Sequence, residues 1–202
     1  MGLEDGRWLK ETLLLYALSR FEPLGRKTLS RILRVTEGTV RSIIIRLKGQ
    51  GYITVDKTGV GITSEGSLEF QRRLEKMNIE SVRDFPCEGL NIGPSSMAIL
   101  IRGVVHRGTS CLEERDQAVR AGALGAVTII YGNGVYTMPG VYGNLEVEAP
   151  EWYRAISNTF KQPEGEACIV VVFGENRWIA VEAAFSVAVK MATTSQTNYA
   201  SN

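Results

Sequence analysis

Basic side chains cluster between Arg20 and Lys57, where nine arginine and lysine residues stand against three acidic ones. The nine are Arg20, Arg26, Lys27, Arg31, Arg34, Arg41, Arg46, Lys48 and Lys57. The whole chain has a net charge of +1, but residues 1–80 hold 14 basic and 10 acidic residues (+4), and residues 81–202 hold 9 and 12 (−3). Guanidinium and ammonium groups gathered in this way pair with phosphates, so the cluster indicates a polyanion as partner.

Side chains that carry out catalysis or hold metal ions are scarce. His106 is the only histidine, which excludes a site with several histidine ligands and ties any serine or cysteine triad to that one position. Cys87, Cys111 and Cys168 are far apart and odd in number, so their spacing predicts neither a disulfide framework nor a zinc site. We therefore predict no enzyme activity, no metal site and no cofactor.

The hydrophobic period of the first 80 residues predicts the elements that must position the basic side chains. Helical spacing predicts helices over 8–21, 26–33, 36–48 and 67–77. Two short extended pieces on either side of Thr58-Gly59 predict a β-hairpin before the last helix. Two helices joined by a tight turn and followed by a hairpin are typical of a winged helix-turn-helix, whose last helix before the hairpin enters the DNA major groove.

The third predicted helix combines a core stripe with a basic face. Its apolar side chains repeat with the helical period and should be buried, and they are Val40, Ile43, Ile44 and Leu47. Thr36 is placed to cap the first turn of this helix. Gly49 or Gly51 should end it, because glycine accepts the left-handed conformation of a C-cap.

The run LSRILRVTEGTVRSIIIRLKGQGYITVDKTGVGITSEGSLEF resembles the DNA-binding domain of bacterial and archaeal winged-helix regulators, such as the multiple-antibiotic-resistance and leucine-responsive families. Those families show a helix of the form T-V-x6-L-x3-G-x-I and then a wing that ends in a "LT..G" step. The matching residues, over about a third of the chain, are Thr39, Val40, Leu47, Gly51, Ile53, Ile62, Thr63 and Gly66. The resemblance implies a winged helix-turn-helix that binds double-stranded DNA.

In that arrangement the face of the third helix opposite its core stripe contacts the groove. We expect Thr39, Arg41, Ser42 and Arg46 on this face, with Glu37 and Ile45 at its margins. Arg41 or Arg46 can donate two hydrogen bonds to guanine, whereas Thr39 and Ser42 suit phosphate or a thymine methyl. A further set of residues should contact phosphates without reading sequence, namely Arg26, Lys27, Arg31, Arg34 and Lys57.

The second half reads as a separate domain, so the chain is predicted to be α+β with four segments. These are a winged helix over 1–80, a linker over 81–96, an α/β sandwich over 97–192 and a disordered tail over 193–202. The predicted elements of the sandwich follow a βαββαβ pattern with an added C-terminal helix. This order of elements is that of ferredoxin-like domains, and we expect helices on one face of the sheet.

The GluGluArgAsp and AlaGlyAlaLeuGlyAla stretches of residues 97–192 resemble a domain of unknown function found in archaeal winged-helix proteins. Arg107, Thr109 and Ser110 precede a predicted helix, where they either bind an anionic ligand or cap the helix. Four aromatic residues either line an effector pocket or pack in the core, and they are Tyr131, Tyr136, Tyr142 and Trp152.

Together these features predict a cytoplasmic, DNA-binding transcriptional regulator. No run of about 20 apolar residues predicts a membrane span, and the acidic start of the chain argues against a signal peptide. A homodimer is expected because one recognition helix reads only a few base pairs. The second domain then serves dimerisation, a small-molecule effector, or both. Two alternatives stay open: an enzyme in residues 97–192 with a regulatory winged helix, or a protein-interaction scaffold.

Overall fold

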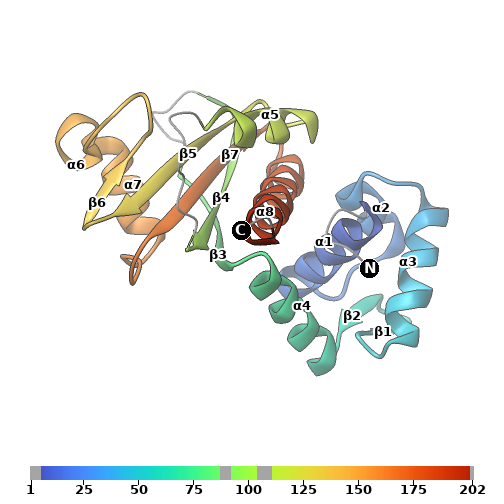
Figure 1. Cartoon of the computed structure of the whole chain (residues 1–202). Helices are drawn as coiled ribbons and strands as arrows, with labels where there is room; N and C mark the ends of the chain where they lie inside the picture. Colours follow the sequence, from blue (N-terminus) through green and yellow to red (C-terminus); the bar gives the residue numbers. More distant parts are fainter. Residues whose placement is uncertain (1–5, 87–91, 104–110, 201–202) are drawn as a thin grey trace. The chain divides into compact units, whose positions relative to one another are not determined.

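The computed structural model describes residues 6–86, 92–103 and 111–200, with no side chains described for 195–200. The chain divides into two compact units, Met1–Lys76 and Met77–Asn202 (Figure 1). We call them the N-terminal unit and the C-terminal unit. The first boundary lies at Lys76, a few residues before the end at residue 80 that the sequence predicts for the first domain.

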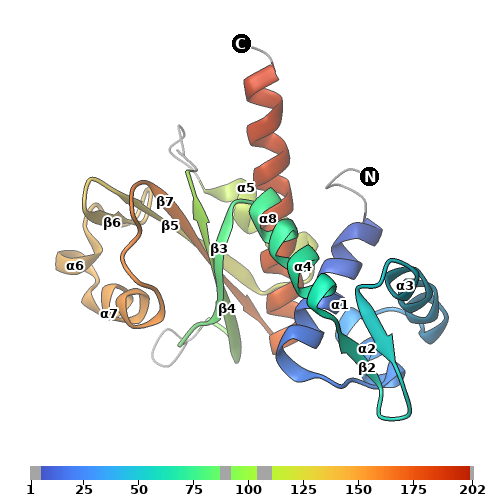
Figure 2. The same ribbon diagram turned by 90° about the horizontal axis from the view of Figure 1, so that it is seen from below.

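The N-terminal unit has the order helix, helix, helix, β-hairpin, helix, which confirms the predicted winged helix-turn-helix. Its elements are α1 (Gly6–Phe21), α2 (Arg26–Leu33), α3 (Glu37–Gly49), β1 (Ile53–Val55), β2 (Val60–Ile62) and α4 (Ser64–Lys76). The strands β1 and β2 pair antiparallel, and Leu24 adds an isolated bridge to Val60. Figure 2 shows the hairpin extending from the three helices as a wing.

The position of α3 follows from its apolar stripe and from the turns at its ends. Val40, Ile43, Ile44 and Leu47 are buried, as their helical period predicts. Thr36 is the N-cap, with its hydroxyl accepting a hydrogen bond from the Thr39 amide at 3.2 Å. These contacts fix the core side of α3 and leave its other side available to a partner.

Backbone turns around α3 hold it against its neighbours. Arg34 ends α2 in the left-handed conformation, with φ of 54°, which makes the turn into α3 tight. Gly51 follows α3 with φ of 78°, a conformation that favours glycine. Gly66 of α4 lies so close to the residue before β1 that an added Cβ would lie 1.9 Å from the Tyr52 carbonyl oxygen.

The C-terminal unit contains a five-stranded antiparallel sheet with strand order β3-β4-β7-β5-β6. Its elements are β3 (Ile79–Asp84), β4 (Ser95–Arg102), α5 (Leu112–Arg120), β5 (Gly125–Gly132), β6 (Val135–Thr137), α6 (Leu145–Glu148), α7 (Pro150–Thr159), β7 (Ala167–Gly174) and α8 (Arg177–Ala200). The predicted βαββαβ succession is present from β4 to β7. Within the sheet β7 lies between β4 and β5, and the hairpin strand β6 lies at the edge.

Helices cover both faces of this sheet, whereas the sequence predicts helices on one face. Trp152 and Ile156 of α7 pack with Ile169 and Val171 in one apolar cluster. Figure 1 shows α7 on one side of the sheet and α8 on the other. The helices α5 and α8 contact the sheet as well, and alternation along β7 turns Val170 to the opposite face. Every residue of β7 is therefore buried, as in strands covered on both sides.

Two segments differ from their predicted state. Residues 81–96, expected as a linker, contribute to β3 and β4, and the Ser96 hydroxyl donates to the Phe85 carbonyl at 2.8 Å. Residues 193–202, expected as a disordered tail, continue α8 as far as Ala200. The hydroxyls of Thr193 and Thr194 bond to carbonyls four residues earlier, which lets these polar residues remain in a helix. Across the described residues, every helix is too short or too polar to span a bilayer.

Candidate nucleic-acid interface

The outer face of α3 is built from small, basic and apolar residues. Gly38, Arg41, Ser42, Ile45 and Lys48 are all exposed. They lie three or four residues apart, so they share one side of the helix. Ile45 is 65% exposed and lies at the centre of this face rather than at its margin, where the sequence analysis expects it. We call these five residues the α3 outer face.

Arg41 lies where the amino-terminal ends of α2 and α3 meet. Together with Arg26, Glu37 and Gly38 it lines a depression on the surface. Arg26 is the first residue of α2 and is exposed like Arg41. Two guanidinium groups line this depression near the amino-terminal ends of two helices, and both features favour an anion there. The Glu37 carboxylate offsets part of that positive charge.

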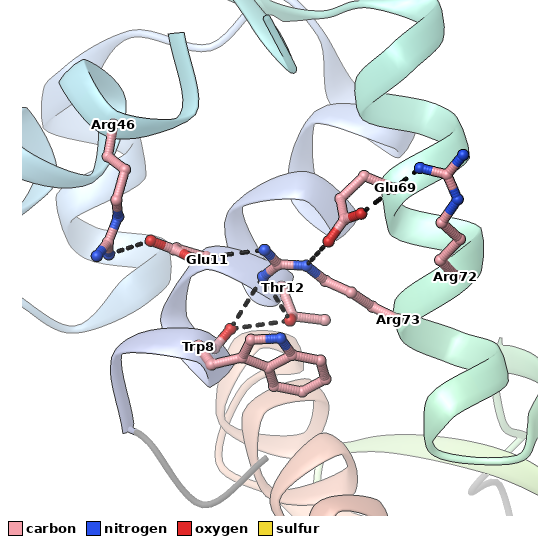
Figure 3. A network of polar contacts seen from close by, with 7 residues as sticks. All are labelled: Trp8, Glu11, Thr12, Arg46, Glu69, Arg72 and Arg73. Atoms are coloured by element: carbon pink, nitrogen blue, oxygen red, sulfur yellow. Dashed lines mark hydrogen bonds and ion pairs between the residues drawn. The ribbon is translucent and has the colours of Figure 1, made fainter. Parts of the chain in front are cut away.

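Arg46 is engaged by the protein itself. Its guanidinium forms an ion pair with Glu11 of α1, and its side chain is 31% exposed while that of Glu11 is 1% exposed (Figure 3). A guanidinium held against a buried carboxylate has fewer N–H groups available to a guanine than the exposed Arg41 has. The structure therefore disfavours base reading by Arg46 and favours Arg41.

Glu11 belongs to a buried ionic network that joins α1, α3 and α4 (Figure 3). Its second oxygen lies 3.4 Å from Arg73 of α4, whose side chain is 4% exposed. Arg73 also donates to Glu69 at 2.9 Å, to the Thr12 hydroxyl at 3.1 Å and to the Trp8 carbonyl at 3.3 Å. The network fixes α3 relative to the helices behind it.

The residues predicted to contact phosphates lie on the outside of the N-terminal unit. The exposed residues are Arg26, Lys27 and Arg31 of α2, Arg34 at the C-cap of α2, and Lys57 of the wing turn. The helices α2 and α3 pack together, so the basic residues of α2 belong to an element that neighbours α3. Lys57 belongs to the separate turn of the hairpin.

The wing turn is held by Asp56. The Asp56 carboxylate accepts hydrogen bonds from the Thr58 hydroxyl and from the amides of Thr58 and Gly59. These bonds, with the Thr58 hydroxyl as the largest cause, lower the pKa of Asp56 below its usual value. Gly59 adopts φ of 145°, and an added Cβ would lie 2.9 Å from the Leu24 carbonyl oxygen. The turn therefore presents Lys57 in a defined conformation.

The other predicted site residues belong to the C-terminal unit. Arg107, Thr109 and Ser110 fall outside the described residues, so their expected ligand binding stays a prediction. Four aromatic residues belong to the core cluster of the C-terminal unit or pack against it, and they are Tyr131, Tyr136, Tyr142 and Trp152. Tyr131 and Tyr136 have ring centroids 4.7 Å apart, and burial is the main cause that raises the pKa of Tyr136 to about 12. This geometry favours core packing over an effector pocket for these side chains.

The sequence analysis places Ile45 at the margin of the outer face and does not name Glu11 at all. The position of Ile45, four residues after Arg41 and three after Ser42, already places it outside the core stripe. Glu11 was detectable only as a carboxylate inside the apolar run of α1, between Trp8 and Leu18. Such a buried charge requires a partner, although the sequence does not identify it.

Comparison with known proteins divides the chain at the same place as the structure. Residues 11–77 match the family described as "CggR N-terminal DNA binding domain", and residues 92–191 match the family described as "Domain of unknown function (DUF4443)". No curated protein matches the chain significantly.

A hypothetical protein from Pyrococcus horikoshii OT3 has a similar solved structure. It is 21% identical, with a TM-score of 0.67, and the alignment covers 94% of this chain and 93% of that one. At this level of identity the likeness shows a shared fold over both units. The chain is therefore a winged-helix DNA-binding domain fused to a domain of unknown function.

Proposed function

We propose that the protein is a transcription regulator that binds double-stranded DNA as a homodimer and places α3 in the major groove. The observation that carries this proposal is the α3 outer face, which is exposed and stands beside the basic surface of α2. An exposed helix face flanked by cations matches a groove flanked by phosphates. The DNA-binding family matched by residues 11–77 supports the same reading.

The side chains of this surface have different roles in the proposal. Arg41 is the candidate base reader, because it is exposed on α3 and can donate two hydrogen bonds to guanine O6 and N7. Thr39 and Ser42 contact phosphate or a base edge from the same helix. Arg46 keeps its Glu11 partner and contributes at the margin of the groove.

Five cations supply the sequence-independent part of binding, and they are Arg26, Lys27, Arg31, Arg34 and Lys57. If each neutralises one phosphate, log K should fall with log salt with a slope of about −4.5 per protomer, since each contact contributes about −0.9. Two protomers on one site should about double the slope. A protein-interaction scaffold would lack such a steep dependence.

The C-terminal unit is proposed to bring two copies together, to sense a small-molecule effector, or both. Two α3 helices related by a two-fold axis would read two half-sites and double the set of contacts. The protein would act in the cytoplasm, where its DNA target lies.

The test begins with selection of bound fragments from the source genome by the full-length protein. Affinity for a selected fragment is then measured by fluorescence anisotropy across a range of salt concentrations. The proposal expects a steep salt slope and a roughly 5- to 150-fold weaker complex for Arg41→Ala on the selected fragment, from a loss of about 1–3 kcal/mol. Lys76→Ala is the matched control, because it removes one exposed charge from α4. Equal binding by the wild type and Arg41→Ala would refute the role of Arg41.

A further inference from the structure

We infer that Ile45 contacts the C5-methyl group of a thymine and so determines part of the DNA sequence that is bound. This inference rests on the proposed function and adds a specific chemical target to it. Thymine is the base that presents a methyl group in the major groove, beside its O4 acceptor. An exposed aliphatic side chain at the centre of a groove-facing helix is the group that fits it.

The surroundings of Ile45 leave it standing out from α3. Three small residues flank Ile45 on the same side of the helix. Gly38 lies seven residues before it, Ser42 three residues before it and Gly49 four residues after it. Among the described residues outside the helix itself, no heavy atom lies within 4 Å of a Cβ built at Gly49, and the nearest to one at Gly38 is the Thr36 hydroxyl at 3.7 Å. The small neighbours leave Ile45 65% exposed.

The packing of the described residues does not account for either glycine. Gly38 and Gly49 are the second and the last residue of α3. Neither has a positive φ, and both positions have room for a methyl group. Close approach of a partner's backbone or base edge to α3 would explain why glycine stands at both positions. Such an approach brings the Ile45 side chain to the floor of the groove.

The charges around Ile45 select DNA as the partner. Arg41 and Lys48 lie on the same face at four residues before and three residues after it, and Arg26 lies beside Arg41 across the surface depression. A purely apolar protein partner would leave these cations without counter-charges. A thymine methyl lies between two phosphate backbones, so it offers an apolar contact at the centre and negative charge on both sides.

The neighbouring arginine does not compete for this position. Arg46 follows Ile45 in the sequence, but its guanidinium is drawn back to the buried carboxylate of Glu11 (Figure 3). Thr39 also carries a methyl group, but its hydroxyl and amide are both engaged with the Thr36 hydroxyl. Ile45 is therefore the apolar side chain of α3 best placed to contact base edges in the major groove.

The experiment removes the methyl group from the DNA and the side chain from the protein. Each thymine of a selected fragment is replaced in turn by deoxyuridine, which keeps the base pair and lacks only the C5-methyl. Full-length wild type should bind about three- to tenfold more weakly when one particular thymine in each half-site is replaced, as expected for losing an apolar contact of one methyl group.

Ile45→Ala should bind the thymine fragment more weakly than wild type does, and it should bind the thymine and deoxyuridine versions of that position equally. Leu68→Ala is the matched control, because Leu68 is 57% exposed on α4 and outside the α3 outer face. This variant should keep the wild-type sensitivity to deoxyuridine. Circular dichroism checks that each variant is folded, which is expected because both apolar side chains are exposed.

The outcomes separate this inference from the proposed function. If wild type selects a fragment with a steep salt slope but no thymine is sensitive, or if the sensitivity persists in Ile45→Ala, the role of Ile45 is refuted and DNA binding stands. If wild type binds no DNA at all, the proposed function fails, and the inference fails with it.

Discussion

Replacing Glu11 by alanine should weaken the N-terminal unit much more than any exposed substitution does. Glu11 is a 1% exposed carboxylate paired with both Arg46 and Arg73. Removing one partner of a buried ion pair costs about 3–5 kcal/mol, because the other charge stays buried. We expect the lower end, about 3 kcal/mol, because Arg73 keeps Glu69 at 2.9 Å and Arg46 is partly exposed to water.

Glu11→Gln separates the charge from the shape of the side chain. The amide still accepts one hydrogen bond, so we expect a loss of about 1–2 kcal/mol, in the range found for hydrogen bonds to charged groups. Glu75→Gln is the control, because it makes the same chemical change at an exposed position of α4. It should change stability by less than about 0.5 kcal/mol.

Native-state hydrogen exchange of the full-length chain measures these changes in each unit separately. A loss of 3 kcal/mol corresponds to an about hundredfold drop in the protection of the α1 and α3 amides. Protection of β4 and β7 should stay unchanged and serves as an internal reference. If protection of α1 and α3 in Glu11→Ala stays within about threefold of wild type, the ionic network does not hold α3 and our account of Arg46 is refuted.

The remaining predictions concern packing and ionisation. Gly66→Ala should cost about 3 kcal/mol or more in thermal denaturation, because its Cβ would lie 1.9 Å from the Tyr52 carbonyl oxygen, whereas Gly38→Ala should gain up to about 1 kcal/mol. Equal melting temperatures would contradict both. The Asp56 carboxylate has a pKa below 3.8 in the folded wing, so its stabilising bonds are present above that pH and are lost as the pH falls through the lower folded value. Amide chemical shifts of the wing turn should report this change, and a midpoint at or above 3.8 would count against it. The pKa of Tyr136 is about 12 against 10 in the unfolded chain, so its stabilising effect is full below pH 10 and is lost between pH 10 and 12. An ultraviolet difference titration should lose its highest ionisation in Tyr136→Phe, and an unchanged profile would contradict the burial of this hydroxyl.

Local patterns in the sequence are sufficient to predict the N-terminal unit. The apolar period from Val40 to Leu47 gives the buried side of α3, and Thr36 gives its first turn. The outer face follows from the same period, and Arg41 and Ser42 are exposed as predicted. The helical period does not predict that Arg46 forms an ion pair, because its partner Glu11 lies 35 residues earlier on another helix.

The C-terminal unit was less predictable because its arrangement depends on long-range pairing. The pairing of Val82 with Ile99 makes a strand of a segment in which Pro86 and Gly89 suggest a linker. The order of strands depends on β7 pairing with both β4 and β5, a choice that the succession of elements does not determine. The polar residues after Met191 stay helical because Thr193 and Thr194 satisfy their hydroxyls within α8.

The most direct test of DNA recognition by the α3 outer face compares the wild type with Arg41→Ala on a selected fragment and on an unrelated duplex, at several salt concentrations. Wild type should prefer the selected fragment, and the substitution should remove most of that preference while the salt slope on the unrelated duplex changes by at most about one. If Arg41→Ala keeps the full preference, or if wild type distinguishes neither duplex and shows no salt dependence, α3 does not read DNA.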